Sequence, residues 1–386
     1  MKALVRNPNS LTDRGIEFMR TGDIAIVGTG SSNKNQSIET GIYPFYVRSK
    51  EVFRIDSYEF DETAIVIPGE GGVGEIFHYV EGKYALHQRA YRIVYSPEIV
   101  LPKFAYYYFQ THFREFIKTK AVDGTVASIR KPMIEDFLIP IFPLDVQASM
   151  VELFDQFVML EDNLKHELAN RDRQYKKYSD DFFGSLDDSN SKSMFLSEIA
   201  GIFDGVHQTP TYTNEGIKFV SVENIANLES STKCISAEDY DKLYRTKPTR
   251  GDLLMTRIGS VGKCAVIETD EPLAYYVSLA LLKPDRRLTT SGYLRHYLES
   301  FSGKLELDKR TLHHAVPLKI NLGDIGKIVV RIPSLDSQTK IVEILDLFSA
   351  LTMSSKGGIS TEIALRRRQF EYYRRALLTF DVHGGL

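Results

Sequence analysis

Apolar and polar residues alternate in residues 64–95 and again in residues 252–283, and a glycine-rich stretch interrupts the alternation in both segments. A period of two residues is typical of strands with one buried face, and the glycines predict the turns that join them. After each segment the apolar spacing changes to three and four residues, which predicts a helix behind Pro102 and another behind Ser291. The pattern therefore predicts strands followed by a helix at two places in the chain.

A longer helical pattern follows the first of these segments. Apolar or aromatic residues recur in steps of three and four from Met150 to Phe182, close to the heptad seam of helices that pack side by side. We expect one helix from about Val146 to Phe183 with Asp145 as its N-cap. Such a helix would span roughly 57 Å at 1.5 Å per residue. One small domain cannot cover that length, so the sequence predicts a partner helix.

The partner helix is expected late in the chain, because the sequence repeats itself there. Residues 332–348 (IPSLDSQTKIVEILDLF) match residues 141–157 (IFPLDVQASMVELFDQF) at eight of seventeen positions. Residues 366–378 match residues 171–183 more weakly, and the second copy holds four additional residues around SSKGG, 354–358. Glycine weakens a helix interior. Whether this insert breaks the second helix or lengthens it is left open.

Composition narrows the class of protein. The length of 386 residues suggests two to four domains at about 100–200 residues each. Cys234 and Cys264 form no CxxC motif, so we expect neither a disulfide framework nor a zinc knuckle, but a reducing compartment. No run of 18 apolar residues and no signal-peptide pattern is present, which predicts a soluble, cytoplasmic protein without a membrane partner. The net charge of −3 argues against a generic polyanion binder but not against a local basic face.

Several motifs resemble parts of catalytic sites, but each of them is incomplete or lies in the wrong structural context. Residues 69–74 fit GxGxxG, but the following residues alternate like a strand instead of opening a helix, so a β-turn is favoured. Residues 259–263 match only part of a phosphate-binding loop. Residues 81–83 (EGK) fit the ExK of metal-dependent nucleases, but they fall in a predicted hairpin turn. The chain also lacks the GxSxG and [ND]PP[YF] motifs, and we predict no catalytic residue and no metal site.

The sequence resembles a known family, the specificity (S) subunits of type I restriction–modification enzymes. The motifs that carry the resemblance open and close the two long helices, and glycine-led strands match more loosely. They are IPIFPLDVQ (139–147), RIPSLDSQ (331–338), ELANRDRQYKKY (167–178), EIALRRRQFEYYRRALLTF (362–380), GIYPFYV (41–47) and GIKFVSV (216–222). The chain departs from the family at the residue before the glutamine, where Val146 and Ser337 replace the common glutamate.

The resemblance implies an α+β fold with a pseudo-twofold internal repeat. Two globular α/β target-recognition domains would be separated by two long antiparallel coiled-coil helices. The expected order is a first recognition domain at 1–143, a spacer helix at 144–185, a second recognition domain at 186–333 and a second helical region at 334–386.

The resemblance also implies a function. The chain would be a non-catalytic subunit that reads a bipartite, asymmetric site on double-stranded DNA. It would assemble with two methyltransferase (M) subunits and, in the full complex, with restriction and motor (R) subunits. S-adenosylmethionine, ATP and Mg²⁺ would bind only to those partners, and this chain would hold no cofactor.

Candidate DNA-contacting residues are those with base-reading side chains on predicted loops. The segments SIRK (128–131) and KRTLHH (309–314) occupy equivalent places before the two exit strands, which strengthens both. The predicted DNA-binding residues are Asn33, Lys34, Arg48, Lys50, Arg89, Thr125, Ser128, Arg130, Lys131, His207, Gln208, Arg257, Lys263, Lys309, Arg310, His313 and His314.

The aromatic and basic character of the long helices predicts that they also dock partner subunits. The predicted docking residues are Phe154, Phe157, Arg171, Gln174, Tyr175, Tyr178, Leu345, Phe348, Arg366, Gln369, Phe370 and Tyr373. Two alternatives remain open at this stage: a metal-dependent nuclease that uses the ExK motif, and a coiled-coil adaptor that binds only protein.

Overall fold

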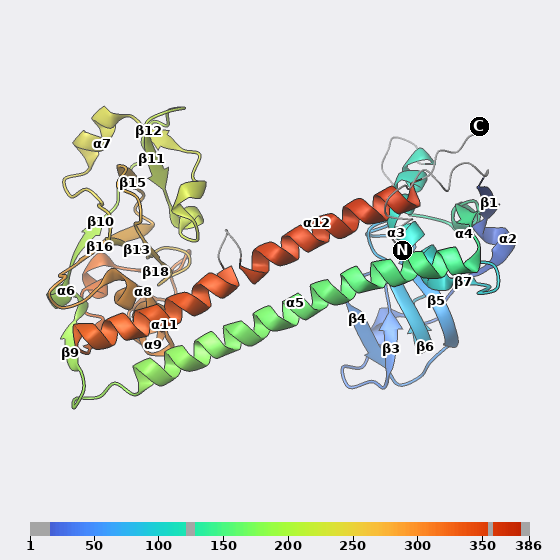
Figure 1. The fold of residues 1–386 in the computed structure, drawn as a ribbon, viewed down its shortest axis with the longest axis horizontal. Helices are drawn as coiled ribbons and strands as arrows, with labels where there is room; N and C mark the ends of the chain where they lie inside the picture. Colours follow the sequence, from blue (N-terminus) through green and yellow to red (C-terminus); the bar gives the residue numbers. More distant parts are fainter. Residues whose placement is uncertain (1–15, 121–127, 354–357, 380–386) are drawn as a thin grey trace. The chain divides into compact units, whose positions relative to one another are not determined.

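A computed structural model describes residues 16–120, 128–353 and 358–379. The chain divides into two compact units (Figure 1). Unit 1 consists of Met1–Leu164 together with Ile363–Leu386, and unit 2 of Lys165–Glu362. Each unit therefore combines a mixed domain with pieces of long helix from two distant parts of the sequence.

Unit 1 contains a six-stranded sheet in the order β2-β7-β5-β6-β3-β4. Its pairings are antiparallel except for the parallel pair β3 and β6. The strands are β2 (Ala25–Thr29), β3 (Tyr43–Tyr46), β4 (Val52–Ile55), β5 (Phe60–Pro68), β6 (His78–Leu86) and β7 (Ala90–Tyr95). The predicted strands and the glycine turn between β5 and β6 are confirmed, because Gly71, Gly72 and Gly74 have positive φ and no helix opens there.

The core of unit 1 lies between this sheet and α3 (Pro102–Thr119). Phe104, Phe109 and Phe113 recur along one face of α3 and are fully buried, as the helical spacing predicts. Shorter elements close the domain: β1 (Glu17–Arg20) pairs with β8 (Leu138–Ile141), and α2 (Thr21–Ile24), the 3-10 turn η2 (Lys34–Gln36) and α4 (Lys131–Glu135) complete it.

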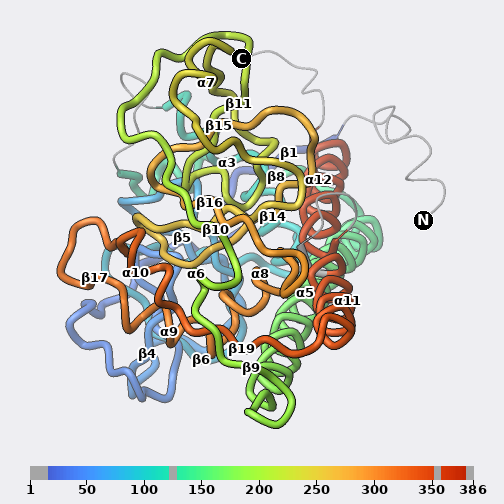
Figure 2. Tube along the Cα trace, turned by 90° about the vertical axis from the view of Figure 1, so that its left-hand side faces the viewer, coloured from blue at the N-terminus to red at the C-terminus, as the bar shows by residue number. Residues whose placement is uncertain are grey.

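Unit 2 repeats the strand order of this sheet, but the counterpart of β6 differs. Here that strand is divided into β14 (Cys264–Val266) and β15 (Leu273–Tyr275), so the sheet separates into β10-β16-β13-β14 and β12-β11-β15. Figure 2 shows β10 (Ala200–Asp204) and β16 (Leu279–Pro284) side by side, in agreement with their antiparallel pairing. The remaining strands are β9 (Lys192–Phe195), β11 (Ile217–Val220), β12 (Cys234–Ile235), β13 (Leu253–Thr256), β17 (Thr311–Leu312), β18 (Lys319–Ile320) and β19 (Val329–Ile332).

The helix predicted behind Ser291 is two helices in the structure. It divides into α8 (Ser291–Glu299) and α9 (Phe301–Asp308), because Ser300 adopts an extended conformation and its side chain caps α9 by accepting from the Gly303 amide. A Cβ on Gly303 would lie 2.0 Å from the carbonyl oxygen of Tyr297, so only glycine permits this close turn. The other short helices of unit 2 are α6 (Leu196–Ile199), η4 (Val222–Asn224), η5 (Leu228–Ser230), α7 (Ala237–Leu243) and α10 (Leu322–Ile325).

The first long helix, α5, runs without a break from Leu144 to Gly184. The prediction that Asp145 is its N-cap was wrong. The helix begins at Leu144, one residue before Asp145, and the Pro143 carbonyl accepts the amides of Val146 and Gln147. Asp145 lies instead in the first turn, where its charge is favourable beside the helix dipole.

The second long helical segment is two helices, α11 (Leu335–Met353) and α12 (Ile359–Leu378). Residues 354–357 of the SSKGG insert lie outside the described residues. Within unit 1, α12 runs beside the first part of α5 in the opposite direction (Figure 1). The predicted antiparallel pairing of helices is thus present in this unit.

The repeated glutamine of the LDxQ motif has the same role in both units. Gln147 is fully buried, accepts from the Leu101 amide at 2.8 Å and donates to the carbonyls of Ile99 (3.0 Å) and Phe142 (2.8 Å). It therefore ties the start of α3 to the start of α5. Gln338 makes the corresponding bonds in unit 2, and its partners are Leu288, Thr289, Thr290 and Pro333.

An aspartate that recurs in both copies also joins the long helix to the helix of the mixed domain, but its hydrogen-bond partner differs between the copies. In unit 1, Asp155 accepts from the Tyr107 hydroxyl at 2.5 Å. In unit 2, Asp346 lies 2.8 Å from Nε2 of His296, which is 1% exposed and whose Nδ1 lies 3.0 Å from the Tyr175 hydroxyl. The repeat has thus kept the carboxylate and changed its partner.

Three histidines of unit 1 predict that its stability depends on pH. Burial is the main cause that lowers the pKa of His78, His87 and His112 below the ordinary value of 6.5. Below pH 6.5 the unfolded chain takes up protons that the folded unit resists, so stability is complete above this pH and falls as the pH drops toward the folded-state pKa values. We expect amide hydrogen exchange in unit 1 to show this loss between pH 7 and pH 5. Replacing His112 with Gln should remove part of it, and an unchanged pH dependence would contradict the assignment.

Candidate nucleic-acid interface

Loops from four segments of unit 1 meet at one place, where backbone bonds fix their relative positions. Ser32 bridges to His87, and the Gln88 amide donates to the Ser32 carbonyl at 3.0 Å. The Gly69 amide donates to the Arg89 carbonyl at 2.9 Å, and the Gly69 carbonyl accepts from Ile129 at 2.8 Å. The loops after β2, after β5, before β7 and before α4 therefore form one surface.

Three of the predicted DNA-binding residues come together on this surface. The Asn33 side chain accepts from Nε2 of Gln88 at 2.6 Å. Arg48 and Arg89 both donate to Glu70, Arg89 at a distance of 2.9 Å. These residues lie far apart in the sequence, so their convergence is a result of the fold. The structure thus places amide and guanidinium groups, which match adenine and guanine edges, next to each other.

The other predicted residues of unit 1 are more dispersed. Lys34 lies 4.6 Å over the Phe53 ring, and Lys131 pairs with Glu135 at 3.5 Å within α4. Lys50, Ser128 and Arg130 are exposed, and Ser128 forms an isolated antiparallel β-bridge with Glu70. Thr125 lies outside the described residues. The prediction that these residues contact DNA stays a prediction.

Unit 2 has an equivalent meeting point of loops, with Arg257 at its centre. Arg257 donates to both carboxylate oxygens of Asp204 (2.8 and 2.9 Å) and to the Val277 carbonyl (2.9 Å). Its backbone carbonyl accepts from the Ile320 amide at 2.9 Å. The Arg257 side chain is only 9% exposed. Its geometry favours a structural role that holds the loops together, rather than the base contact that the sequence predicted.

The remaining predicted residues of unit 2 lie around this centre or beside α9. His207 is 70% exposed and contacts Asp204 at 2.8 Å, which makes it the exposed member of the Arg257 cluster. Lys309 and Arg310 both pair with Glu306, at 2.6 and 2.8 Å, and so contribute to the end of α9. The other exposed members are Gln208, Lys263, His313 and His314.

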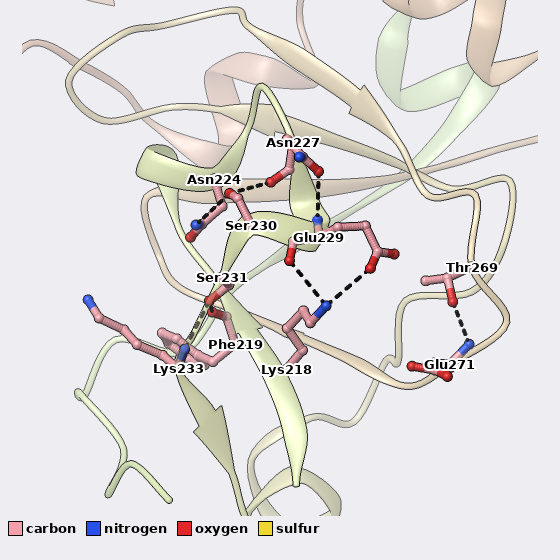
Figure 3. Close-up of polar contacts among 10 residues, drawn as sticks. All are labelled: Lys218, Phe219, Asn224, Asn227, Glu229, Ser230, Ser231, Lys233, Thr269 and Glu271. Carbon is pink, nitrogen blue, oxygen red and sulfur yellow. Dashed lines mark hydrogen bonds and ion pairs between the residues drawn. The ribbon is translucent and has the colours of Figure 1, made fainter. Parts of the chain in front are cut away.

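A further group of polar residues lies around β11 and the turns that follow it, where the sequence suggested no site (Figure 3). Lys218 pairs with Glu229 at 3.2 Å, and Asn227 accepts from the Glu229 amide at 3.0 Å. Ser231 donates to the Phe219 carbonyl. These bonds are local and satisfy the backbone of the turns, so they support the shape of the segment more than they present free groups to a ligand.

Sequence reasoning missed Glu70, Gln88 and Asp204, which organise these two clusters. A base-reading residue can be suspected from its side chain, but a carboxylate that orients an arginine is recognisable only when the fold brings the two together. The available signal was weak: Gln88 directly precedes Arg89 after a buried strand.

Four of the residues predicted to dock partners, Phe154, Phe157, Phe370 and Tyr373, pack inside unit 1. Phe154 is fully buried, with its ring centroid 6.0 Å from that of Phe370. The rings of Phe157 and Tyr373 stack at 5.7 Å. These four residues join α5 to α12 within the unit. Docking by them stays a prediction, and their contacts already account for their aromatic character.

The same holds in unit 2. Tyr178 lies 5.2 Å from Phe348 between ring centroids, Tyr175 contacts His296, and Leu345 is fully buried. The remaining predicted docking residues, half-buried or exposed on the long helices, are Arg171, Gln174, Arg366 and Gln369. The most exposed apolar residues of α12 are different ones, Leu365 (52%) and Tyr372 (68%).

The ExK residues do not form a metal centre in the described structure. Glu81 and Lys83 lie inside β6, not in the predicted hairpin turn; Glu81 accepts from Tyr79, and Lys83 lies over the Tyr58 ring at 4.6 Å. In the described ranges, no three His, Cys, Asp or Glu side chains are grouped so as to hold a metal ion. None of the helices described combines the length and apolar content that a membrane crossing needs.

Comparison with known proteins agrees with this duplicated architecture. The model of the type I restriction modification DNA specificity domain matches the chain twice, at residues 13–170 and 189–365. The chain belongs to this family. The first match covers the mixed domain of unit 1 and α5 up to residue 170, and the second covers the mixed domain of unit 2, α11 and the start of α12.

Relatives and solved structures of the family cover nearly the whole chain. A putative type I restriction enzyme specificity subunit from Haemophilus influenzae is 23% identical over 359 residues, 89% of either chain. The EcoR124I/EcoR124II specificity subunit of Escherichia coli is 26% identical over 250 residues, 61% of this chain and 60% of that one. The crystal structure of the S subunit from M. genitalium superposes with a TM-score of 0.60 at 16% identity, over 94% of this chain and 95% of that one.

Proposed function

We propose that this protein is the DNA-recognition subunit of a type I restriction–modification complex and has no catalytic site of its own. Each unit would read one half of a bipartite site. Because the two domains have diverged in their loops and in the chemistry of their central clusters, the two half-sites would differ in sequence. A duplicated chain with two unlike readers is suited to an asymmetric target, whereas a homodimer reads a palindrome.

The observation that carries this proposal is the recurrence of one loop arrangement in both units. In unit 1, the loops after β2 and after β5 and the segment before β8 meet through backbone bonds. In unit 2, the loops after β10 and after β13 and the segment before β19 meet in the same way. Loops held by a rigid scaffold are the usual place for recognition residues. The family membership supports the same function.

Partners would supply the chemistry. We propose that two methyltransferase subunits bind this chain and that restriction and motor subunits complete the assembly. S-adenosylmethionine, ATP and Mg²⁺ would bind to those subunits. A structure that resembles this chain, with a TM-score of 0.56 at 16% identity, belongs to work on complex assembly of the type I R-M system, which supports a multisubunit setting.

The test is methylome sequencing of the host with and without this gene. We expect one bipartite adenine-methylation motif to disappear completely when the gene is deleted and to return when it is restored. In vitro, the chain alone should bind duplex DNA weakly, because its net charge is −3 and it neutralises few phosphates. Addition of the methyltransferase subunits should raise affinity and steepen its salt dependence. An unchanged methylome would contradict the proposal.

The two alternatives predict different results in the same experiments. A nuclease would cut DNA as a purified chain with a divalent metal and would lose this activity in Lys83→Ala. An adaptor that binds only protein would fail to bind DNA even in the presence of the methyltransferase. The geometry of residues 81–83 within β6 gives no support to the first alternative.

A further inference from the structure

The cluster of Arg48, Glu70 and Arg89 in unit 1 has features of a built recognition element. The three residues come from separate places: after β3, after β5 and directly before β7. Nη1 of each arginine donates to the same carboxylate oxygen, Oε1 of Glu70. The two arginine side chains are 43% and 60% exposed, whereas Glu70 is 32% exposed. The carboxylate thus lies beneath two guanidinium groups that face solvent.

The backbone beneath the cluster is held from several sides. His87 is 5% exposed, and its Nδ1 accepts from the Arg89 amide at 3.0 Å, while its own amide donates to the Tyr46 carbonyl at 2.9 Å. A Cβ on Gly69 would lie 2.8 Å from the Arg89 carbonyl oxygen, so the strand end and the Arg89 loop approach as closely as glycine allows. The positions of both arginines are therefore set by the fold as well as by their side chains.

The hydrogen-bond donors that remain available belong to the two planar, positively charged guanidinium groups. A guanidinium carries five donors, and only Nη1 of each arginine is engaged by Glu70. Among the described residues neither arginine makes another side-chain hydrogen bond or ion pair. The hydrogen bond from Arg89 is the main cause that lowers the pKa of Glu70, so this carboxylate stays charged at neutral pH. With two cations and one anion the cluster keeps a formal charge of +1.

We propose that Arg48 and Arg89 form a preassembled reader of guanine, in which each arginine contacts a G·C base pair in the half-site bound by unit 1 and Glu70 is the positioning residue. The inference rests on the proposed function. Guanine presents two acceptors, N7 and O6, in the major groove, and the planar fork of arginine matches them in a bidentate contact. A carboxylate that fixes the fork in advance reduces the entropy lost on binding.

Neighbouring side chains favour contact with base edges over contact with phosphate alone. Gln88 precedes Arg89, is exposed and donates to Asn33. Amide side chains match adenine, whereas the phosphate backbone is bound equally well by lysine. In unit 2 the corresponding centre is the buried Arg257, so this reader belongs to unit 1 alone.

The experiment uses the full chain assembled with its methyltransferase subunits, and measures methylation of a DNA library randomised at every position of the wild-type motif. Arg89→Lys keeps the charge but loses the fork. We expect this variant to lose discrimination at one G·C position by on the order of 10–100-fold, with the other half-site unchanged. Arg48→Lys should relax a position in the same half-site. Glu70→Gln should weaken discrimination at the positions that the two arginines read, while the remaining positions stay as specific as before.

The matched control is Arg114→Lys, which alters an exposed ion pair of unit 1 with Glu75 at 2.8 Å and should leave the motif unchanged. Unaltered specificity of the second half-site shows that the variants fold and assemble. A uniform loss of methylation over all sequences in Arg89→Lys would indicate a phosphate contact and overturn the inference. So would an unchanged motif, or a wild-type half-site without a G·C pair for these variants to relax. If the wild-type complex methylates no bipartite site at all, the proposed function itself fails.

Discussion

Replacing Arg257 with methionine is expected to lower the free energy of unfolding of unit 2 by about 3–5 kcal/mol, the range for breaking a buried ion pair by removal of one partner. The methionine side chain has a similar length but leaves the Asp204 carboxylate without its guanidinium and the Val277 carbonyl without its donor. The loops after β10 and after β13 would lose the group that joins them. The proposed recognition of a half-site by unit 2 should therefore be lost together with stability.

Denaturant unfolding followed by amide hydrogen exchange in unit 2 measures this effect. Arg287→Met is the matched control, since Arg287 also pairs with an aspartate but its side chain is 88% exposed. The loss of such a surface pair should cost no more than about 1 kcal/mol. If the two variants lose equal stability, Arg257 does not have the structural role assigned to it.

Replacing Gln147 with leucine is expected to destabilise unit 1 by roughly 3 kcal/mol. The substitution removes three hydrogen bonds from a fully buried site and leaves the Leu101 amide and two carbonyls unsatisfied. Each buried group without a partner costs about 1–3 kcal/mol, although local rearrangement recovers part of this. The starts of α3 and α5 should separate first, and their amides should exchange faster than those of the sheet.

Two comparisons sharpen this test. Gln174→Leu changes an exposed position of α5 and should have little effect on stability. Gln338→Leu should reproduce the loss in unit 2, because its side chain makes the corresponding bonds. A neutral effect of Gln147→Leu would mean that the repeated glutamine is kept for a reason other than this tie.

The parts of the fold that could be predicted from the sequence are those whose pattern recurs over many residues. The apolar seam of α5 extends over roughly nine turns, from Met150 to Phe182, and the two copies of LDxQ mark the repeat directly. Helix ends depend on single backbone bonds, which is why the cap at Asp145 was wrong. The break at Ser300 was missed because α8 and α9 continue the same apolar spacing and differ only at one extended residue.

Site residues were harder to predict for a physical reason. Composition identifies an arginine but not its surroundings, and Arg89 and Arg257 are indistinguishable in the sequence. The fold leaves Arg89 60% exposed and Arg257 only 9% exposed. Likewise, Phe154 and Tyr373 suggested docking because they are aromatic, but the chain's own helices already cover them.

The composition of unit 1 has a consequence for its synthesis. Phe154 is covered by Phe370, and the carbonyl of Leu378 lies 2.9 Å from the ring of His112. The ribosome completes Lys165–Glu362, all of unit 2, before it makes the helix that covers Phe154. At about 5–20 residues per second, this delay lasts roughly 10–40 s. The domain that is translated first is therefore the last to be finished, and its aromatic surface remains open to chaperones while the other unit folds.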